Sequence, residues 1–155
     1  IIQRAFMDKN KMILPIEKEI DVISVGLTFK RFLEVADIIK KPIAVVTDND
    51  ENYAISITKK YKDFKDSKAI TIFADDRETL PTLEPQIVDA NKNNLKQLCE
   101  ILEIDFKIYS TVEKISKFMR KPENKVPFAL KIFNSEKSIK YPKYINDVID
   151  WCDEK

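Results

Sequence analysis

The sequence contains no histidine, one glycine (Gly26) and only two cysteines among its 155 residues. Without histidine, the chain cannot form a Ser-His-Asp or Cys-His catalytic site, a His-ligated zinc site or a His general base. With one glycine, it cannot contain the Gly-x-x-x-x-Gly-Lys phosphate loop of ATPases. Any acid–base chemistry must therefore use Asp, Glu, Lys, Tyr or metal-bound water.

Long apolar runs are also absent, and none approaches the roughly 20 residues of a membrane helix. We therefore expect no membrane partner. Cys99 and Cys152 lie in apolar helical patterns, which predicts buried thiols and a reducing, cytoplasmic location. The length, with 44% hydrophobic and 34% charged residues, is typical of one folded domain over residues 1–155. Because the chain begins Ile-Ile-Gln-Arg, without an initiator Met, we expect it to be a piece of a longer protein.

An apolar run followed by two acids organises the rest of the sequence. Residues 43–46 read Ile-Ala-Val-Val, which predicts a strand buried on both faces. Asp48 and Asp50 follow it, at the carboxyl edge where open α/β sheets bind ligands. Two neighbouring carboxylates without an adjacent cation repel each other, and oxygen ligands suit Mg²⁺ or Mn²⁺. The pattern predicts a divalent-metal site for phosphoryl chemistry.

Hydrophobic periodicity predicts an α/β fold with a central, mostly parallel sheet flanked by helices. Strands and helices are expected to alternate, with strands over 20–25, 43–47 and 69–73 and helices over 1–10, 29–40 and 53–64. A lone Gly26 directly after a strand predicts either a positive φ or a close approach of another group. An ordinary tight turn is the alternative.

A long acidic loop is expected from Ala74 to about Ala90, and loops of this length are often functional. Glu84 lies within it, between Leu83 and Pro85, and is the best positioned of its acids. A solvated acidic connection is the alternative interpretation.

The C-terminal part, about residues 91–155, is predicted to be mainly helical. A fourth strand is expected at 106–109, and Ser110 to Glu113 match a capping box. Asn124 is expected to cap the next helix, with Pro127 in its first turn, so that Lys125 opens a helix. Pro142 is expected to open the last helix.

Charge is unevenly distributed along the chain. Residues 107–143 hold ten Lys or Arg and three acids, a net charge of about +7, whereas the preceding residues and the last twelve are each net acidic by about 3. This asymmetry suits a site that binds cations on one side and a polyphosphate on the other. A solvated helix face is the common alternative for such charge runs.

The order of several short motifs resembles the C-terminal domain of OLD-family (overcoming lysogenization defect) ATP-dependent endonucleases. The motifs span most of the chain, and they are Val25-Gly26 before Phe29-Lys-Arg-Phe32, Val45-Val-Thr-Asp-Asn-Asp50, Thr82-Leu-Glu-Pro85, Lys125-x-x-Phe-Ala129 and Pro142-x-Tyr-Ile145. The resemblance implies a Rossmann-like TOPRIM fold and a metal-dependent DNA endonuclease.

Residue by residue, the resemblance implies that Asp48 and Asp50 hold Mg²⁺ or Mn²⁺, in a two-metal site in the intact protein. Glu84 would help to place metal, and Lys125 would stabilise charge on the phosphate during cleavage. Gly26 would form the small-residue turn near the site. The implied partners are DNA and an upstream ABC-type ATPase domain of the same protein, in DNA repair or defence against phage.

Two features of the family are missing from the sequence, the phosphate loop of its ATPase domain and a glutamate motif of its first strand. TOPRIM nucleases use a glutamate at the end of their first strand, and no Glu-Gly motif occurs here. We expect that strand to precede residue 1, which would leave the chain inactive by itself. The sequence leaves open whether the chain forms a homo-oligomer.

Two other functions fit the same residues. A haloacid-dehalogenase-like phosphatase also places Asp-x-Asp after a strand, but it favours Thr or Val where this chain has Asn52. A non-catalytic docking or DNA-binding module would use the basic segment 107–143 without Mg²⁺.

Overall fold

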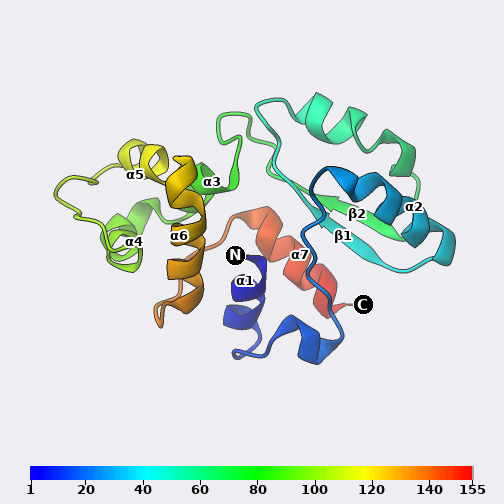
Figure 1. Cartoon of the computed structure of the whole chain (residues 1–155), viewed down its shortest axis with the longest axis horizontal. Coiled ribbons are helices and arrows are strands. Elements are labelled where there is room, and N and C mark those ends of the chain that lie inside the picture. The colour runs from blue at the N-terminus through cyan, green and yellow to red at the C-terminus, as the bar shows by residue number, and fades with distance from the viewer. Residues whose placement is uncertain (155) are drawn as a thin grey trace.

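The computed structural model describes residues 1–154, except for the side chain of Leu27. Its sheet contains two parallel strands, β1 (Ile43–Val46) and β2 (Ile70–Phe73). Ile43 lies opposite Ile70, and Val46 lies opposite Phe73. The fold is therefore mixed α/β, as predicted, and both strands end at the same edge (Figure 1).

Both faces of the sheet are covered, because the side chains of β1 alternate between two apolar clusters. Ala44 and Val46 pack with α1 (Ile2–Lys9) and α7 (Lys143–Asp153). Ile43 and Val45 pack with the cluster that contains Leu33 of α2 (Phe29–Ile39). The strand is half-buried along its length, so the expectation of full burial was too strong.

A third cluster fills the helical end of the molecule. It is formed by α3 (Leu83–Ala90), α4 (Leu95–Leu102), α5 (Val112–Met119) and α6 (Pro122–Asn134), which lie together in Figure 1. Fully buried side chains here include Ile87, Leu98, Ile115 and Met119. Leu83 and Tyr141 touch both this cluster and the cluster that α1 and α7 form beneath the sheet, and so connect the two.

The predicted strand at 20–25 is wrong. These residues are assigned neither strand nor helix, and Val22 and Ile23 are exposed. A strand requires backbone partners on a neighbouring strand. Among the described residues, only β1 and β2 pair in this way. Ile20 alone of this segment packs against the cluster under the sheet.

The segment 106–109 is a turn rather than a strand. The backbone N–H groups of Ile108 and Tyr109 both donate to the carbonyl oxygen of Asp105. The Asp105 carboxylate also accepts from the N–H of Lys107, at 2.8 Å. This local Asx turn competes with extended pairing, and an apolar pattern alone does not reveal it.

Helix starts differ from the predictions in three places. The acidic loop ends at Thr82, because Pro85 is tolerated in the first turn of α3. Thr111, one residue after Ser110, caps α5 by accepting from Lys114 N. Pro122 opens α6, so Pro127 lies inside that helix.

The predicted helix 53–64 is formed by a π-helix, Ala54–Lys59, followed by a short 3₁₀ turn. Ile57, Tyr61 and Phe64 are buried as expected, but Ala54 is exposed. Gly26 has φ +52°, which confirms the positive φ, although a Cβ there would meet no atom within 4 Å. Close approach of another group is therefore not the reason for this glycine. Cys99 is buried and Cys152 is half-buried, and both are free thiols.

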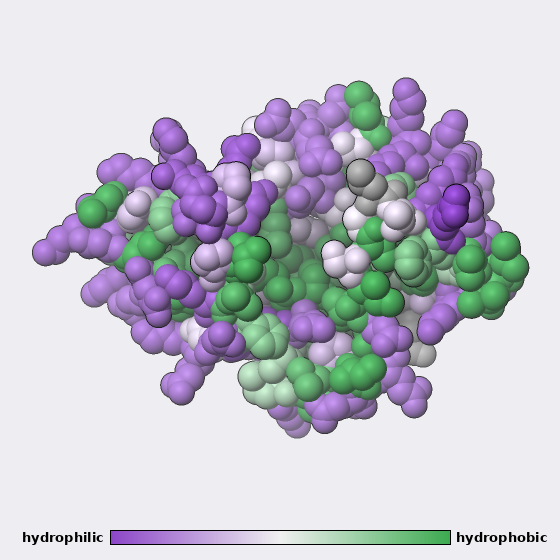
Figure 2. All heavy atoms as spheres, in the orientation of Figure 1, coloured by the Kyte–Doolittle hydropathy of each residue, from purple (hydrophilic) through white to green (hydrophobic). Residues whose placement is uncertain are grey.

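Polar and apolar side chains are unevenly distributed over the surface. Figure 2 shows apolar side chains along the centre of one face, with polar side chains over the end formed by α4, α5 and α6. Exposed apolar residues are concentrated in the segment 20–25 and on α2, and include Ile23, Phe32, Val35, Ile38 and Ile39. No helix within residues 1–154 is long and apolar enough to cross a membrane.

Candidate metal site

The two acids of the Asp-x-Asp motif lie directly after β1, as the sequence predicts. Asp48 is half-buried, Asn49 is fully buried and Asp50 is exposed. Asp50 and Glu51 both have positive φ, 49° and 68°, without being glycine. Such backbone conformations are costly and persist only where surrounding contacts fix them. The acidic turn is therefore held in shape by its neighbours.

Asp48 lies among other charges. Its pKa is raised to about 6, first because of burial and then because of the negative charges of Glu84 and Asp50. Lys125 and the backbone N–H of Leu83, at the start of α3, act to lower that pKa. The fold thus brings Asp48, Glu84 and Lys125 to one place although they are far apart in the sequence.

Glu84 is the most buried of the three predicted ligands, with 5% of its surface exposed. One carboxylate oxygen, Oε1, lies 3.0 Å from Lys125 Nζ. The other, Oε2, is buried and has no hydrogen-bond partner. The hydroxyl of Thr82 is also buried and makes no hydrogen bond of acceptable geometry. A buried carboxylate oxygen that accepts no hydrogen bond can instead serve as a ligand for a cation.

The charge of Glu84 is nevertheless favoured. Burial acts to raise the pKa of Glu84, but the nearby Thr82 hydroxyl, its own backbone N–H and Lys125 outweigh burial and lower that pKa. Lys125 therefore neutralises Glu84 in this structure. It is the fourth residue of α6, which begins at Pro122, so the expectation that Lys125 opens a helix was wrong.

The donors present fit a hard divalent cation, because Asp48 and Glu84 offer carboxylate oxygens and Glu84 Oε2 has no other partner. Asp50 acts on Asp48 as a nearby charge, and its own side chain is exposed. Within residues 1–154, no three or more acidic, Cys or His side chains already stand at ligand spacing. Asp48 and Glu84 are thus the core of the site, with Asp50 at its rim.

Sequence reasoning missed the residue between the two acids. The Asn49 amide Nδ2 lies 2.9 Å from Asp75 O, 3.0 Å from Arg77 O and 3.3 Å from Leu80 O. Its Oδ1 accepts from the backbone N–H of Glu51, at 3.0 Å. The sequence did contain a signal for this role, because Asn49 is an uncharged amide between the two candidate metal ligands Asp48 and Asp50.

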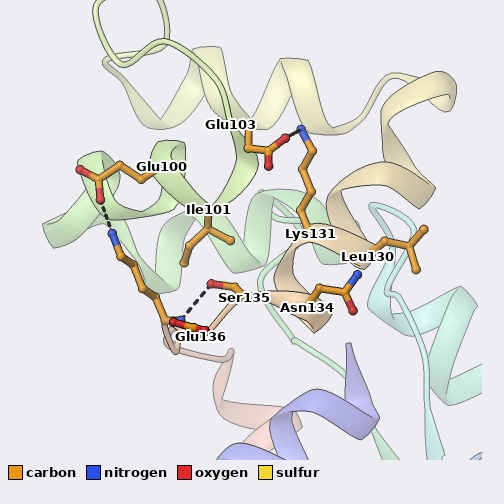
Figure 3. Close-up of a pocket in the computed structure, with 9 residues that line it drawn as sticks. Glu100, Ile101, Glu103, Leu130, Lys131, Asn134, Ser135 and Glu136 are labelled. Atoms are coloured by element: carbon orange, nitrogen blue, oxygen red, sulfur yellow. Dashed lines mark hydrogen bonds and ion pairs between the residues drawn. The ribbon is translucent and has the colours of Figure 1, made fainter.

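A separate pocket of about 430 Å³ lies between α4 and α6. Figure 3 shows two ion pairs at this pocket, Lys131 with Glu103 and Lys137 with Glu100. Its charges are therefore largely neutralised. None of the predicted site residues lines it, so it is not part of the candidate metal site.

Comparisons with known proteins add no family assignment to this geometry. No protein-family model matches the chain, and no match was found among curated proteins or solved structures.

Proposed function

We propose that this chain is the metal-binding part of a divalent-metal-dependent DNA endonuclease of the OLD type, with a TOPRIM domain. The observation that carries the proposal is the buried, unpartnered Oε2 of Glu84 beside Asp48, whose own charge is disfavoured without a cation. A cation between these carboxylates would relieve both costs. The ordered sequence motifs support the nuclease assignment independently of this geometry.

In this proposal Asp48 and Glu84 hold Mg²⁺ or Mn²⁺, and Asp50 contributes from the rim. A bound ion would supply Lewis-acid polarisation of the phosphate and activation of water. Lys125 has a long, half-exposed side chain that reaches Glu84 from α6. It can turn from Glu84 to a phosphate oxygen once a cation takes over the Glu84 charge, and it then stabilises negative charge during cleavage.

DNA as the substrate is supported by the unpaired cations of the helical end. Lys114, Lys117, Arg120 and Lys121 are exposed on or next to α5, and no ion pair to them occurs within the described residues. Cations without protein partners are available to the phosphate backbone. A docking module that only binds DNA is the second candidate, because these residues serve it equally well.

Nicking of supercoiled plasmid by a protein that contains this chain tests the proposal. We expect Mn²⁺-dependent nicking that Asp48→Asn abolishes and Asp66→Asn leaves unchanged, since Asp66 is an exposed acid beside Lys65. Mn²⁺-independent DNA binding without nicking would instead support the docking module. Beryllofluoride binding that depends on Asp48 would support the phosphatase alternative.

A further inference from the structure

A continuous set of hydrogen bonds links the acidic turn to the helix that carries Glu84. Asn49 reaches the loop after β2 through the three carbonyl oxygens of Asp75, Arg77 and Leu80. The backbone N–H of Asp50 also donates to this loop, to Pro81 O at 3.1 Å. The turn that bears Asp48 and Asp50 is thus fixed to this loop at several points.

The loop is fixed to α3 by a second buried amide. Gln86 is fully buried, and its Nε2 donates to Leu80 O at 2.8 Å. Its Oε1 accepts from the Tyr144 hydroxyl of α7, also at 2.8 Å. Leu80 O therefore accepts from both Asn49 and Gln86. One carbonyl oxygen connects the acidic turn, α3 and, through Gln86, α7.

Arg77 ties the same loop to the far end of α3. It donates to both carboxylate oxygens of Asp75, at 2.9 and 2.6 Å, and to Asp89 Oδ2 at 2.7 Å. The loop is consequently held at both ends of α3. The separation between Asp48 and Glu84 then depends on this loop, since each acid belongs to an element that is bonded to it.

We propose that Asn49 and Gln86 are positioning residues that set the place of Asp48 relative to Glu84 through their shared acceptor, Leu80 O. The inference rests on the proposed metal site and adds to it the residues that hold the two ligands in register. Neither amide is expected to touch the cation. Buried neighbours of metal ligands commonly fix ligand orientation in this way.

The chemistry of the amide explains why the middle residue of the motif is uncharged. Three carbonyl oxygens face Nδ2, and a backbone N–H faces Oδ1, so only a group with a donor end and an acceptor end fits. An aspartate here would place a carboxylate against three carbonyl oxygens. The expected result is displacement of the turn and of both acids with it.

The test compares Mn²⁺ affinity and thermal stability in four variants of the chain, Asn49→Ser, Gln86→Met, Asn91→Ser and Asp48→Asn. Asn91 is the matched control, because it is a buried amide that bonds Ile87 O and both backbone groups of Lys140, away from the acids. We expect Asn49→Ser and Gln86→Met to weaken Mn²⁺ binding by about 10-fold to 100-fold. Asn91→Ser should lower the melting temperature similarly but leave Mn²⁺ affinity unchanged.

The shared acceptor makes a second prediction. Both amides act through Leu80 O, so their effects should not be independent. The fold-loss of Mn²⁺ affinity in the Asn49→Ser/Gln86→Met double variant should be smaller than the product of the fold-losses in the two single variants. If Asn49→Ser does not fold, Gln86→Met against Asn91→Ser decides the question alone. Equal Mn²⁺ affinity in those two folded variants would overturn the inference.

Failure of the inference and failure of the proposed function give different results. If Asp48→Asn loses Mn²⁺ binding while Asn49→Ser and Gln86→Met keep it, the metal site stands and the positioning role is wrong. If Asp48→Asn binds Mn²⁺ as the unsubstituted chain does, the metal site itself is wrong, and the positioning role with it.

Discussion

Lys125 Nζ lies 3.0 Å from Glu84 Oε1, so a lysine of α6 neutralises the most buried acid of the candidate site. The second oxygen of the same carboxylate has no hydrogen-bond partner. Lys125 and a divalent cation would thus share one carboxylate, and they compete for its charge.

Replacing Lys125 by Met should separate binding from catalysis. Removing the competing cation is expected to keep or strengthen Mn²⁺ binding by calorimetry. Plasmid nicking by a protein that contains this chain should fall about 100-fold or more, because the charge on the phosphate is no longer stabilised. Lys131→Met is the control, since Lys131 lies on the same helix as Lys125 but pairs with Glu103 at the end of α4. Loss of Mn²⁺ binding together with nicking would contradict this account of Lys125.

The same substitution should also destabilise the chain without metal. Glu84 is buried, whereas the Lys125 side chain is 49% exposed, so the loss in free energy of unfolding is expected to be about 1 kcal/mol. Saturating Mn²⁺ should restore the lost stability, because it replaces the lost positive charge. Urea unfolding of Lys125→Met and the unsubstituted chain, with and without Mn²⁺, measures this effect. If the variant loses the same free energy of unfolding in both conditions, a cation beside Glu84 would be contradicted.

The Asp75–Arg77 pair predicts a loss of stability in acid. Burial acts to raise the pKa of Asp75, but bonds from Arg77 outweigh it and lower that pKa below its ordinary 3.8. The stabilisation is present above pH 3.8 and is lost as pH falls through the lower folded-state pKa. Asp75→Asn should therefore lower the urea midpoint at pH 7 and have a smaller effect near pH 3. If Asp75→Asn lowered the urea midpoint equally at pH 7 and near pH 3, the charge of Asp75 would not contribute to stability.

Gly26→Ala should cost about 1 kcal/mol of unfolding free energy, because φ is +52° and an L-residue is strained there. A Cβ would meet no atom within 4 Å, so no steric clash adds to that cost. Gly26→Asn should cost less, since Asn tolerates this conformation. Thermal unfolding of both variants tests the point, and a much larger loss in Gly26→Ala would indicate an unseen close contact.

Ile145→Ala should be far more damaging than a surface change of the same kind. Ile145 is fully buried in the cluster beneath the sheet, and truncation there is expected to cost about 2–5 kcal/mol. Ile38 is 78% exposed, and Ile38→Ala should have little effect on unfolding. Equal losses for the two variants would mean that α7 does not form the core described for it.

Local signals predicted the elements that position the acids. Helical spacing located α1, α2 and α7, and short apolar runs located β1 and β2, because each pattern contains apolar residues that pack into one of the clusters on the sheet. The segment 20–25 carries the same apolar signal without a neighbouring strand among the described residues, so its pattern did not produce a strand. Pairing is a property of two segments and cannot be deduced from one.

The candidate site was predictable in its residues but not in its connections. Asp48 was expected from its place after a strand, and Glu84 and Lys125 from the motifs. Their proximity depends on how α3 and α6 pack, which no local pattern specifies. The Asn49–Leu80–Gln86 bonds were missed because backbone carbonyl oxygens accept them, and a backbone acceptor leaves no mark in the sequence.

Calorimetric titration of Mn²⁺ into the unsubstituted chain, Asp48→Asn and Asp66→Asn tests the central claim most directly. The proposed site predicts binding in the unsubstituted chain and in Asp66→Asn, and none in Asp48→Asn. Binding that is the same in all three, or that is absent from all three, would contradict a metal site built on Asp48 and Glu84.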